Sequence, residues 1–341
     1  MRNWATTPAG IGLPILFFFL ALAPDGKTVT AAGTAAAHGR EISQEGPPAH
    51  LDAGGKNTPV SADCAAKRHV AGYDVVLLMG QSNMSGRGEG YDPAIDGPNN
   101  PRIQQWSRAN TIIPAEEHLQ HHDDSGLGTN TNVGMGTAFG RAYVESLPAH
   151  RDVLLVPTAH GGTGLVDGPW SPGGYLFEDA VKRMEAALAS GDEAAGNCAA
   201  AVLWHQGEAD AGHRVKRDAY LSAWTVMIAA LRSRVPATAE APVVLGEFAL
   251  PWAEQNRGKT APILAAIRAV TDSVELTAVA SADGLSVNYP GNVVHFDAAG
   301  QRDFGRRYFD KLGDAIGNDR VGVRLGAEKG STTTASAIEL A

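Results

Sequence analysis

Four polar segments of this chain contain the groups that acyl transfer requires. Ser82 lies in Gly-Gln-Ser-Asn directly after an apolar run, and His295 lies in the late stretch Asn-Val-Val-His-Phe-Asp. Gly162 belongs to a Gly-Gly-Thr turn, and Gln206 and Glu208 belong to Trp-His-Gln-Gly-Glu. Acyl transfer needs a nucleophilic hydroxyl, a base, a carboxylate that orients the base, and N–H donors for the oxyanion. The pattern therefore predicts Ser82 as nucleophile and His295 as base.

Each of these residues also has a structural interpretation. A serine in a turn commonly caps the following helix, and a single histidine commonly packs or faces solvent. The argument for chemistry is that all four segments follow predicted strands at one end of one sheet, which unrelated structural roles would not require.

The elements that would position these groups are apolar runs separated by amphipathic segments. This alternation predicts a parallel sheet with crossover helices. The expected strands are residues 74–80, 152–159, 200–206, 242–249 and 274–281. Ligands bind beyond the carboxyl ends of such strands, where Ser82, Gly162, Gln206 and His295 are expected.

Residues 90–133 interrupt this alternation with a long segment rich in turn-forming residues, of a length typical of functional loops. The segment contains His118, His121, His122, Asp123 and Asp124, which could form a metal site. Their spacing matches no helical metal-binding motif, so a solvated loop without metal is favoured.

Length and charge restrict the class of protein. The 341 residues, 44% of them hydrophobic, suit one large domain with tails. The formal charge of -9 argues against nucleic acid as a partner. Residues 11–23 have the length of a signal-peptide core and are too few to span a bilayer, although an uncleaved anchor is the alternative.

The expected organisation is a signal peptide and the start of a leader at 1–37, a flexible leader at 38–68, the catalytic domain at 69–317 and a disordered tail at 318–341. The expected location is secreted or periplasmic, with no stable membrane span after signal cleavage.

Cys64 and Cys198 are the two cysteines of the chain. Each lies just before an expected strand, so a disulfide could join them if those strands are neighbours. Two unrelated buried thiols are the alternative.

The motifs together resemble those of a known enzyme superfamily. The nucleophile elbow of α/β-hydrolases does not fit, because Gly-Gln-Ser-Asn-Met lacks the second glycine. The combination of Gly-Gln-Ser-Asn, Gly-Gly-Thr, Trp-His-Gln-Gly-Glu and a late His-Phe-Asp-Ala-Ala-Gly-Gln resembles the SGNH hydrolases over about residues 74–310. It most resembles the sialate O-acetylesterase-like group with carbohydrate esterase family 6, which includes acetylxylan esterase-like proteins.

This resemblance implies an α/β fold of three layers, flavodoxin-like, with a five-stranded parallel sheet of order 2-1-3-4-5 flanked by helices. It implies Ser82 as nucleophile, His295 as base, and an oxyanion hole made by Ser82, Gly162 and Gln206. It also implies an acetylated carbohydrate as substrate and no metal or other cofactor. The strand order places the first and third strands side by side, which strengthens the Cys64 to Cys198 pairing.

Asn292 departs from the superfamily pattern, because many members have an aspartate three positions before the histidine. An amide carries no charge to stabilise an imidazolium, so another carboxylate is expected as the third member. Glu208 is the favoured candidate, with Asp283 and Asp297 as weaker ones; a helix N-terminal acid is the structural alternative for Glu208.

Trp170 and Arg87 are the expected substrate-binding residues. Trp170 follows the glycine turn and could lie against a sugar ring, or it could pack in the core. Arg87 could hydrogen-bond sugar hydroxyls or cap local backbone.

The predicted function is that of a secreted serine esterase that removes O-acetyl groups from carbohydrate through an acetyl-serine intermediate. Two alternatives remain open. One is a carbohydrate-binding protein on the same fold that has lost catalysis. Asn292 keeps this alternative open, because it stands where many members have an aspartate. The other is an SGNH esterase directed at a lipid or thioester, which would need a long apolar groove.

Overall fold

The computed structural model describes residues 60–97, 100–122, 132–289 and 291–318. They form an α/β fold around a seven-stranded sheet of order β3-β2-β4-β1-β5-β6-β7. The strands are β1 (Gly72–Gly80), β2 (Ile103–Trp106), β3 (Ile112–Pro114), β4 (Arg151–Pro157), β5 (Cys198–His205), β6 (Val243–Gly246) and β7 (Thr277–Ala280).

The central strands form from continuous apolar runs. Residues 75–79 of β1 are fully buried, and all eight residues of β5 are buried. Strands of a parallel sheet covered on both faces require such runs, because each successive side chain meets a different apolar layer. Val75 and Leu77 accordingly belong to one core cluster, and Val76 and Leu78 belong to the other.

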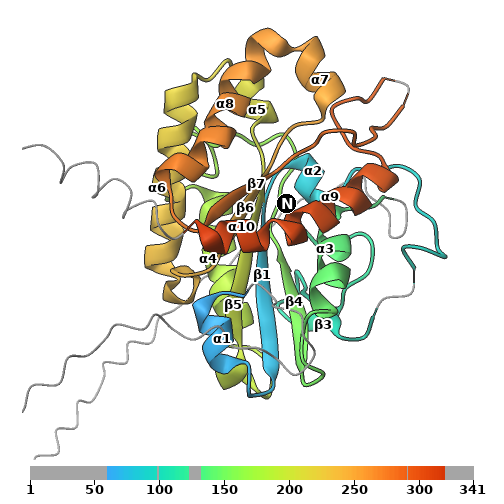
Figure 1. The fold of residues 1–341 in the computed structure, drawn as a ribbon, viewed down its shortest axis with the longest axis vertical. Helices are drawn as coiled ribbons and strands as arrows, with labels where there is room; N and C mark the ends of the chain where they lie inside the picture. The colour runs from blue at the N-terminus through green and yellow to red at the C-terminus, as the bar shows by residue number, and fades with distance from the viewer. Residues whose placement is uncertain (1–59, 98–99, 123–131, 290, 319–341) are drawn as a thin grey trace, which may run out of the picture. The chain divides into compact units, whose positions relative to one another are not determined.

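Helices cover both faces of the sheet (Figure 1). Side chains of α4, α6 and α8 form one core cluster with the sheet, and side chains of α3, α9 and α10 form the other. In the view of Figure 1, α2, α5 and α7 lie toward the upper end and α1 toward the lower end. The helices are α1 (Ala62–Lys67), α2 (Ser82–Ser85), α3 (Met135–Val144), α4 (Tyr175–Leu188), α5 (Glu208–Gly212), α6 (Arg217–Arg234), α7 (Leu250–Gln255), α8 (Arg257–Ser273), α9 (Ala298–Asp310) and α10 (Leu312–Gly317).

The expected five-stranded, fully parallel sheet is corrected to a mixed sheet of seven strands. The additional strands β2 and β3 lie in the segment that was expected to be a solvated loop. β2 pairs parallel to β4, and β3 pairs antiparallel to β2. Strands of four and three residues are too short to show a periodic pattern. The five expected strands nevertheless occupy neighbouring positions, β4-β1-β5-β6-β7.

A disulfide joins Cys64 of α1 to Cys198 at the start of β5, with 5.0 Å between their Cα atoms. α1 lies in residues that were expected to belong to the flexible leader. Ser61 caps this helix by accepting from the N–H of Cys64, and its hydroxyl donates to the carbonyl of Ala199 at 2.7 Å. The disulfide and these bonds together anchor a helix of only six residues to the sheet.

Replacing Cys64 and Cys198 with serine should lower the free energy of unfolding by roughly 4 kcal/mol, because the disulfide closes a long loop in the unfolded chain. The two cysteines are 134 residues apart. Urea titration of the oxidised protein and of the double variant measures the difference. Reductant should destabilise the natural sequence and leave the variant unaffected; equal stability of the two proteins would contradict the prediction.

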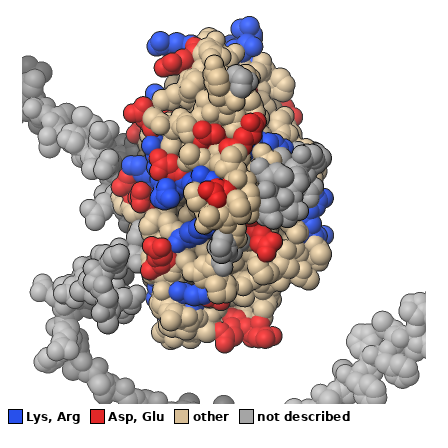
Figure 2. Space-filling view, turned by 90° about the vertical axis from the view of Figure 1, so that its right-hand side faces the viewer, with Lys and Arg blue, Asp and Glu red and all other residues tan. Residues whose placement is uncertain are grey.

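The surface carries charges of both signs. Figure 2 shows acidic and basic side chains interspersed on one face. No described helix is both long and apolar enough to cross a membrane. The expected signal peptide, most of the leader and the tail after Asn318 lie outside the described residues.

Candidate active site

Ser82 lies where β1 ends and α2 begins. Gly80 has φ 137°, and a Cβ atom there would lie 2.1 Å from the carbonyl oxygen of His205, so only glycine fits this turn. The turn carries the chain from β1 into α2, whose first residue is Ser82. The Ser82 side chain, 7% exposed, is therefore held at the carboxyl end of the sheet.

His295 contacts the Ser82 hydroxyl from a loop that precedes α9. Its Nε2 lies 2.9 Å from Ser82 Oγ, although the two residues are 213 positions apart. The prediction that the sequence brings this hydroxyl and this imidazole together therefore agrees with the geometry. Burial lowers the pKa of His295 below its usual value, and the negative charge of Glu208 opposes this shift in part. A neutral imidazole is the form that can accept a proton from Ser82.

Asn292 occupies the position next to the other ring nitrogen of His295. Its Oδ1 lies 2.8 Å from His295 Nδ1. An amide oxygen there accepts the Nδ1–H of a neutral ring, which leaves the lone pair of Nε2 facing Ser82. Asn292 thus fixes the orientation of the base, but it contributes no charge.

Glu208, the predicted third member of the triad, is buried at the start of α5 with 6% of its surface exposed. Its Oε1 accepts from Asn83 Nδ2 at 2.8 Å and lies 3.5 Å from His205 Nε2. Burial disfavours its charged form, but the interaction with His205 and the bond from Asn83 outweigh burial and lower the pKa of Glu208. The Glu208 carboxylate is therefore charged, and it binds Asn83 rather than His295 Nδ1.

Asn83 connects this carboxylate to the loop of the base. Its Nδ2 also donates to the carbonyl of Val294 at 3.0 Å, and its Oδ1 accepts from the N–H of Phe296 at 3.3 Å. These two residues flank His295, so one side chain holds the backbone on both sides of the imidazole. Asn83 belongs to the Gly-Gln-Ser-Asn motif, but no role was predicted for it. The weaker candidate Asp297 instead caps α9 by accepting from the N–H of Gly300 at 2.7 Å.

The glycine turn after β4 faces the hydroxyl. Gly162 has φ 71°, and a Cβ atom there would meet nothing within 4 Å, so its backbone borders open space. The N–H of Ser82 lies in the first turn of α2, where backbone donors have no partner within the helix. These two groups are the expected backbone donors of the oxyanion hole.

Gln206 does not present its amide to the same space. Its Nε2 donates to Asp210 Oδ2 at 2.5 Å and to the carbonyl of Thr163 at 3.0 Å, and the side chain is fully buried. The geometry therefore makes Gln206 a brace between α5 and the glycine turn, instead of the predicted side-chain donor. Gln81 borders the cavity instead, and its Oε1 accepts from the N–H of Ala209 at 3.2 Å.

An open cavity of about 550 Å³ surrounds these groups. Its walls include Ser82, His295 and the glycine turn. Arg87, Gly212, His213 and Trp252 also line it. The predicted binding residue Arg87 is therefore at the site. Trp252 comes from α7, and sequence reasoning missed it because nothing near it resembles a motif.

Trp170, the other predicted binding residue, lies in the core. It is fully buried, its Nε1 donates to Thr163 Oγ1 at 2.9 Å, and its ring packs edge-on against Trp204 with centroids 5.4 Å apart. The Trp170 indole thus holds the glycine turn through its hydrogen bond to Thr163, and it does not line the cavity.

His121 and His122 of the 90–133 segment contact different partners. His121 Nδ1 accepts from the N–H of Ala159 at 3.0 Å, whereas His122 pairs with Asp179 on α4. Among the described residues, the one cluster with metal-ligand spacing is Cys64, Asp74 and Cys198, whose two thiols form the disulfide. Asp123 and Asp124 lie outside the described residues.

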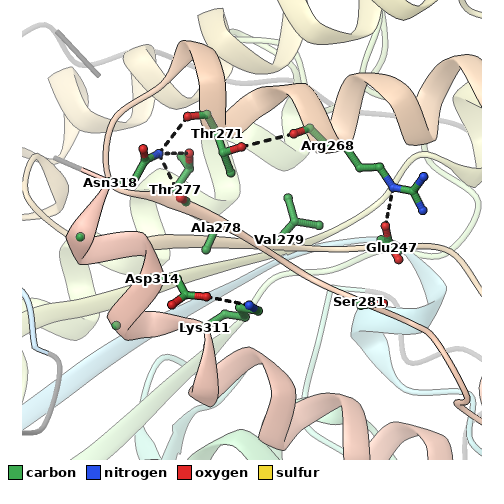
Figure 3. Close-up of a pocket in the computed structure, with 12 residues that line it drawn as sticks. Glu247, Arg268, Thr271, Thr277, Ala278, Val279, Ser281, Lys311, Asp314 and Asn318 are labelled. Atoms are coloured by element: carbon green, nitrogen blue, oxygen red, sulfur yellow. Dashed lines mark hydrogen bonds and ion pairs between the residues drawn. The ribbon is translucent and has the colours of Figure 1, made fainter. Parts of the chain in front are cut away.

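A second cavity of about 670 Å³ lies beside β7, between α8 and α10 (Figure 3). Its charged side chains pair with one another, Arg268 with Glu247 at 2.6 Å and Lys311 with Asp314 at 2.6 Å. It shares no lining residue with the cavity at Ser82.

Comparisons with known proteins show which proteins this chain resembles. A sequence model of the family described as "Carbohydrate esterase, sialic acid-specific acetylesterase" matches residues 72–314. The Arabidopsis thaliana protein named "Probable carbohydrate esterase At4g34215" is 32% identical over 176 residues, which cover 46% of this chain and 62% of that protein. The chain thus matches less than two thirds of that relative's length.

Solved structures show the same fold. The structure of the Arabidopsis thaliana protein AT4G34215 has a TM-score of 0.56 and 26% identity, and the match covers 70% of this chain and 96% of that one. The structure of NanS has a TM-score of 0.61 at 18% identity, covering 76% of this chain and 98% of the other. The NanS likeness concerns the fold alone.

Proposed function

Because this chain belongs to the carbohydrate esterase family of sialic acid-specific acetylesterases, we propose that it removes O-acetyl groups from carbohydrate with Ser82 as nucleophile. The family's reaction is the hydrolysis of a carboxylic ester. The observation that supports the proposal most directly is the 2.9 Å contact between His295 Nε2 and Ser82 Oγ beside an open cavity.

In the proposed reaction, Ser82 Oγ attacks the acetyl carbonyl carbon while His295 Nε2 takes the hydroxyl proton. The N–H groups of Ser82 and Gly162 stabilise the oxyanion. His295 then returns the proton to the departing sugar oxygen, which leaves acetyl-Ser82. Water attacks this ester with His295 again as base, and acetate leaves as Ser82 regains its proton.

The negative charge that supports the imidazolium comes from Glu208 in this proposal. Asn292 orients the ring directly, whereas Glu208 acts electrostatically and through Asn83, which holds the loop of His295. A cysteine-histidine-asparagine arrangement in papain-like proteases shows that an amide can serve as the third member.

Asn292→Asp should raise the pKa of His295 by about 1 unit or more, because a carboxylate would then accept from Nδ1 at hydrogen-bond distance. The protonated ring is inactive as a base, so the acid limb of kcat/KM should move to higher pH. A stronger base should also raise the plateau rate several-fold. A pH–rate profile with p-nitrophenyl acetate measures both effects. Asn292→Ala is the control and should lower the rate; an unmoved acid limb in Asn292→Asp would count against this role of Asn292.

The experiment that tests the function combines labelling with product analysis. A serine-reactive fluorophosphonate should modify Ser82, and the protein should release acetate from acetylated xylan, pectin or sialoside. A carbohydrate-binding protein that lacks catalysis would bind these glycans but leave the label and the acetate absent. A lipid-directed esterase would instead prefer long acyl chains over acetyl.

We also propose that the protein acts outside the cytoplasm. The apolar stretch at residues 11–23 supports export, and the Cys64 to Cys198 disulfide suits an oxidising compartment. Fractionation of the producing cells and N-terminal sequencing of the mature protein test this proposal. An intact N-terminus on protein retained in the cytoplasm would oppose it.

A further inference from the structure

Three aromatic rings gather at His160, the residue directly before the glycine turn. The ring centroid of His122 lies 5.3 Å from that of His160 and 5.7 Å from that of Tyr175. The two histidines are half-buried, whereas Tyr175 is 56% exposed. The cluster therefore offers aromatic surface to a ligand, unlike the indole of Trp170.

The chain connects this aromatic cluster to the proposed active site. His160 directly precedes Gly161 and Gly162, which line the cavity. Tyr175 begins α4, which packs on β4 and β1. In the sheet order β4-β1-β5-β6, His160 and Tyr175 follow β4, whereas Trp252 follows β6. His160 and Trp252 therefore follow strands on opposite sides of β1, the strand that ends just before Ser82.

The cluster is held in place by polar contacts. His122 Nδ1 lies 3.4 Å from Asp179 Oδ2, one turn along α4 from Tyr175. The adjacent His121 is fixed through the N–H of Ala159. The rings are therefore carried by a helix and by a segment bonded to the end of a strand, so a ligand would meet a preorganised surface.

The chemistry of these rings suits a sugar. Aromatic faces pack against the C–H faces of a pyranose, while phenol and imidazole groups exchange hydrogen bonds with its hydroxyls. None of the three rings lines the Ser82 cavity, whereas Gly161 and Gly162, next to His160 in the chain, do. A ring bound here would be a neighbouring unit of the same chain.

We propose that His122, His160 and Tyr175 form a subsite for a second sugar unit, so that the substrate is an acetylated oligosaccharide or polysaccharide and not a single acetylated sugar. This inference rests on the proposed carbohydrate esterase function. The subsite binds the glycan chain and positions its acetyl group, and it takes no part in the chemical step.

The test compares an acetylated hexamer, an acetylated monomer and p-nitrophenyl acetate in the natural sequence and in Tyr175→Ala. Acetylated xylohexaose with acetylated methyl xyloside forms one pair, and the matching mannose oligomer and methyl mannoside form the second. The natural sequence should prefer the hexamer of at least one pair by about tenfold in kcat/KM. Tyr175→Ala should lose most of that preference through KM, as loss of one aromatic contact implies.

Two variants serve as controls. Tyr175→Phe keeps the aromatic face and should keep the preference. Val226→Ala removes an equally exposed apolar side chain, 56%, from α6 and should change nothing. Hydrolysis of p-nitrophenyl acetate should be the same in all four proteins.

The outcomes separate the two proposals. Equal use of hexamer and monomer by the natural sequence would overturn the subsite, and so would an equal loss on all substrates in Tyr175→Ala. Hydrolysis of p-nitrophenyl acetate without acetate release from any sugar would instead overturn the carbohydrate esterase function itself.

Discussion

Ser82→Ala should lower kcat/KM for p-nitrophenyl acetate by about 10⁴-fold to 10⁶-fold, the loss typical when the nucleophile of a serine hydrolase is removed. The hydroxyl at 2.9 Å from His295 is the group in the cavity that can form the acetyl ester. Alanine adds no bulk, so the backbone donors at Ser82 and Gly162 should stay in place. The remaining activity should be the rate that those donors and binding alone support.

Ser85→Ala is the matched control for this variant. Ser85 lies in the same short helix, is buried, and donates to the carbonyl of Ser82 at 3.1 Å. Its loss should change activity by less than about tenfold, since it removes one hydrogen bond of ordinary strength. Fluorophosphonate labelling should disappear in Ser82→Ala and persist in Ser85→Ala. Labelling that persists in Ser82→Ala would assign the nucleophile to another residue.

The sequence was sufficient to predict the five central strands and the proximity of Ser82 and His295, because their signals are local. Apolar runs such as residues 75–79 and 198–205 are visible in any short window, and parallel strands end at a shared edge. Ser82 and His295 each follow such a strand, so their convergence follows from topology. The two short strands β2 and β3 have no comparable signal, and their pairing depends on tertiary contacts with β4.

The roles of the buried polar residues were harder to predict because sequence proximity does not determine side-chain direction. Gln206 and Glu208 are two positions apart, yet one braces Asp210 and the other binds Asn83. Gly207, with φ 140°, separates their orientations. Glu208 therefore supplies a carboxylate near the end of β5, as expected. The contact with His295 Nδ1, however, is made by Asn292.

Sequence proximity is also a poor guide to the positions of Trp170 and Trp252. Trp170 is near the glycine turn in sequence, but its indole is fully buried and packs against Trp204. Trp252 is far from every motif in sequence, but α7 follows the neighbouring strand β6 and brings it to the cavity. Spatial order along the sheet edge, and not distance from a motif, determines which of these two aromatic residues lines the cavity.

His295→Ala should lower kcat/KM by about 10³-fold to 10⁵-fold at neutral pH, because Ser82 would have no base to accept its proton. The natural sequence should lose activity only as the pH falls through the pKa of His295, which burial places below its usual value. The variant should instead gain rate steadily with rising pH, because hydroxide replaces the missing base. Added imidazole should restore part of the activity, since the cavity of about 550 Å³ is open to a small molecule.

A double variant tests whether the two residues act as a unit. Ser82→Ala combined with His295→Ala should be no slower than Ser82→Ala alone, because a base without its nucleophile contributes nothing to this mechanism. His150→Ala is the control, since His150 is exposed just before β4 and does not line the cavity, and it should retain nearly normal activity and pH dependence. Losses that multiply in the double variant would mean that His295 supports catalysis by a route independent of the hydroxyl. The 2.9 Å contact would then be structural, and the base would have to be sought among the other groups of the cavity wall.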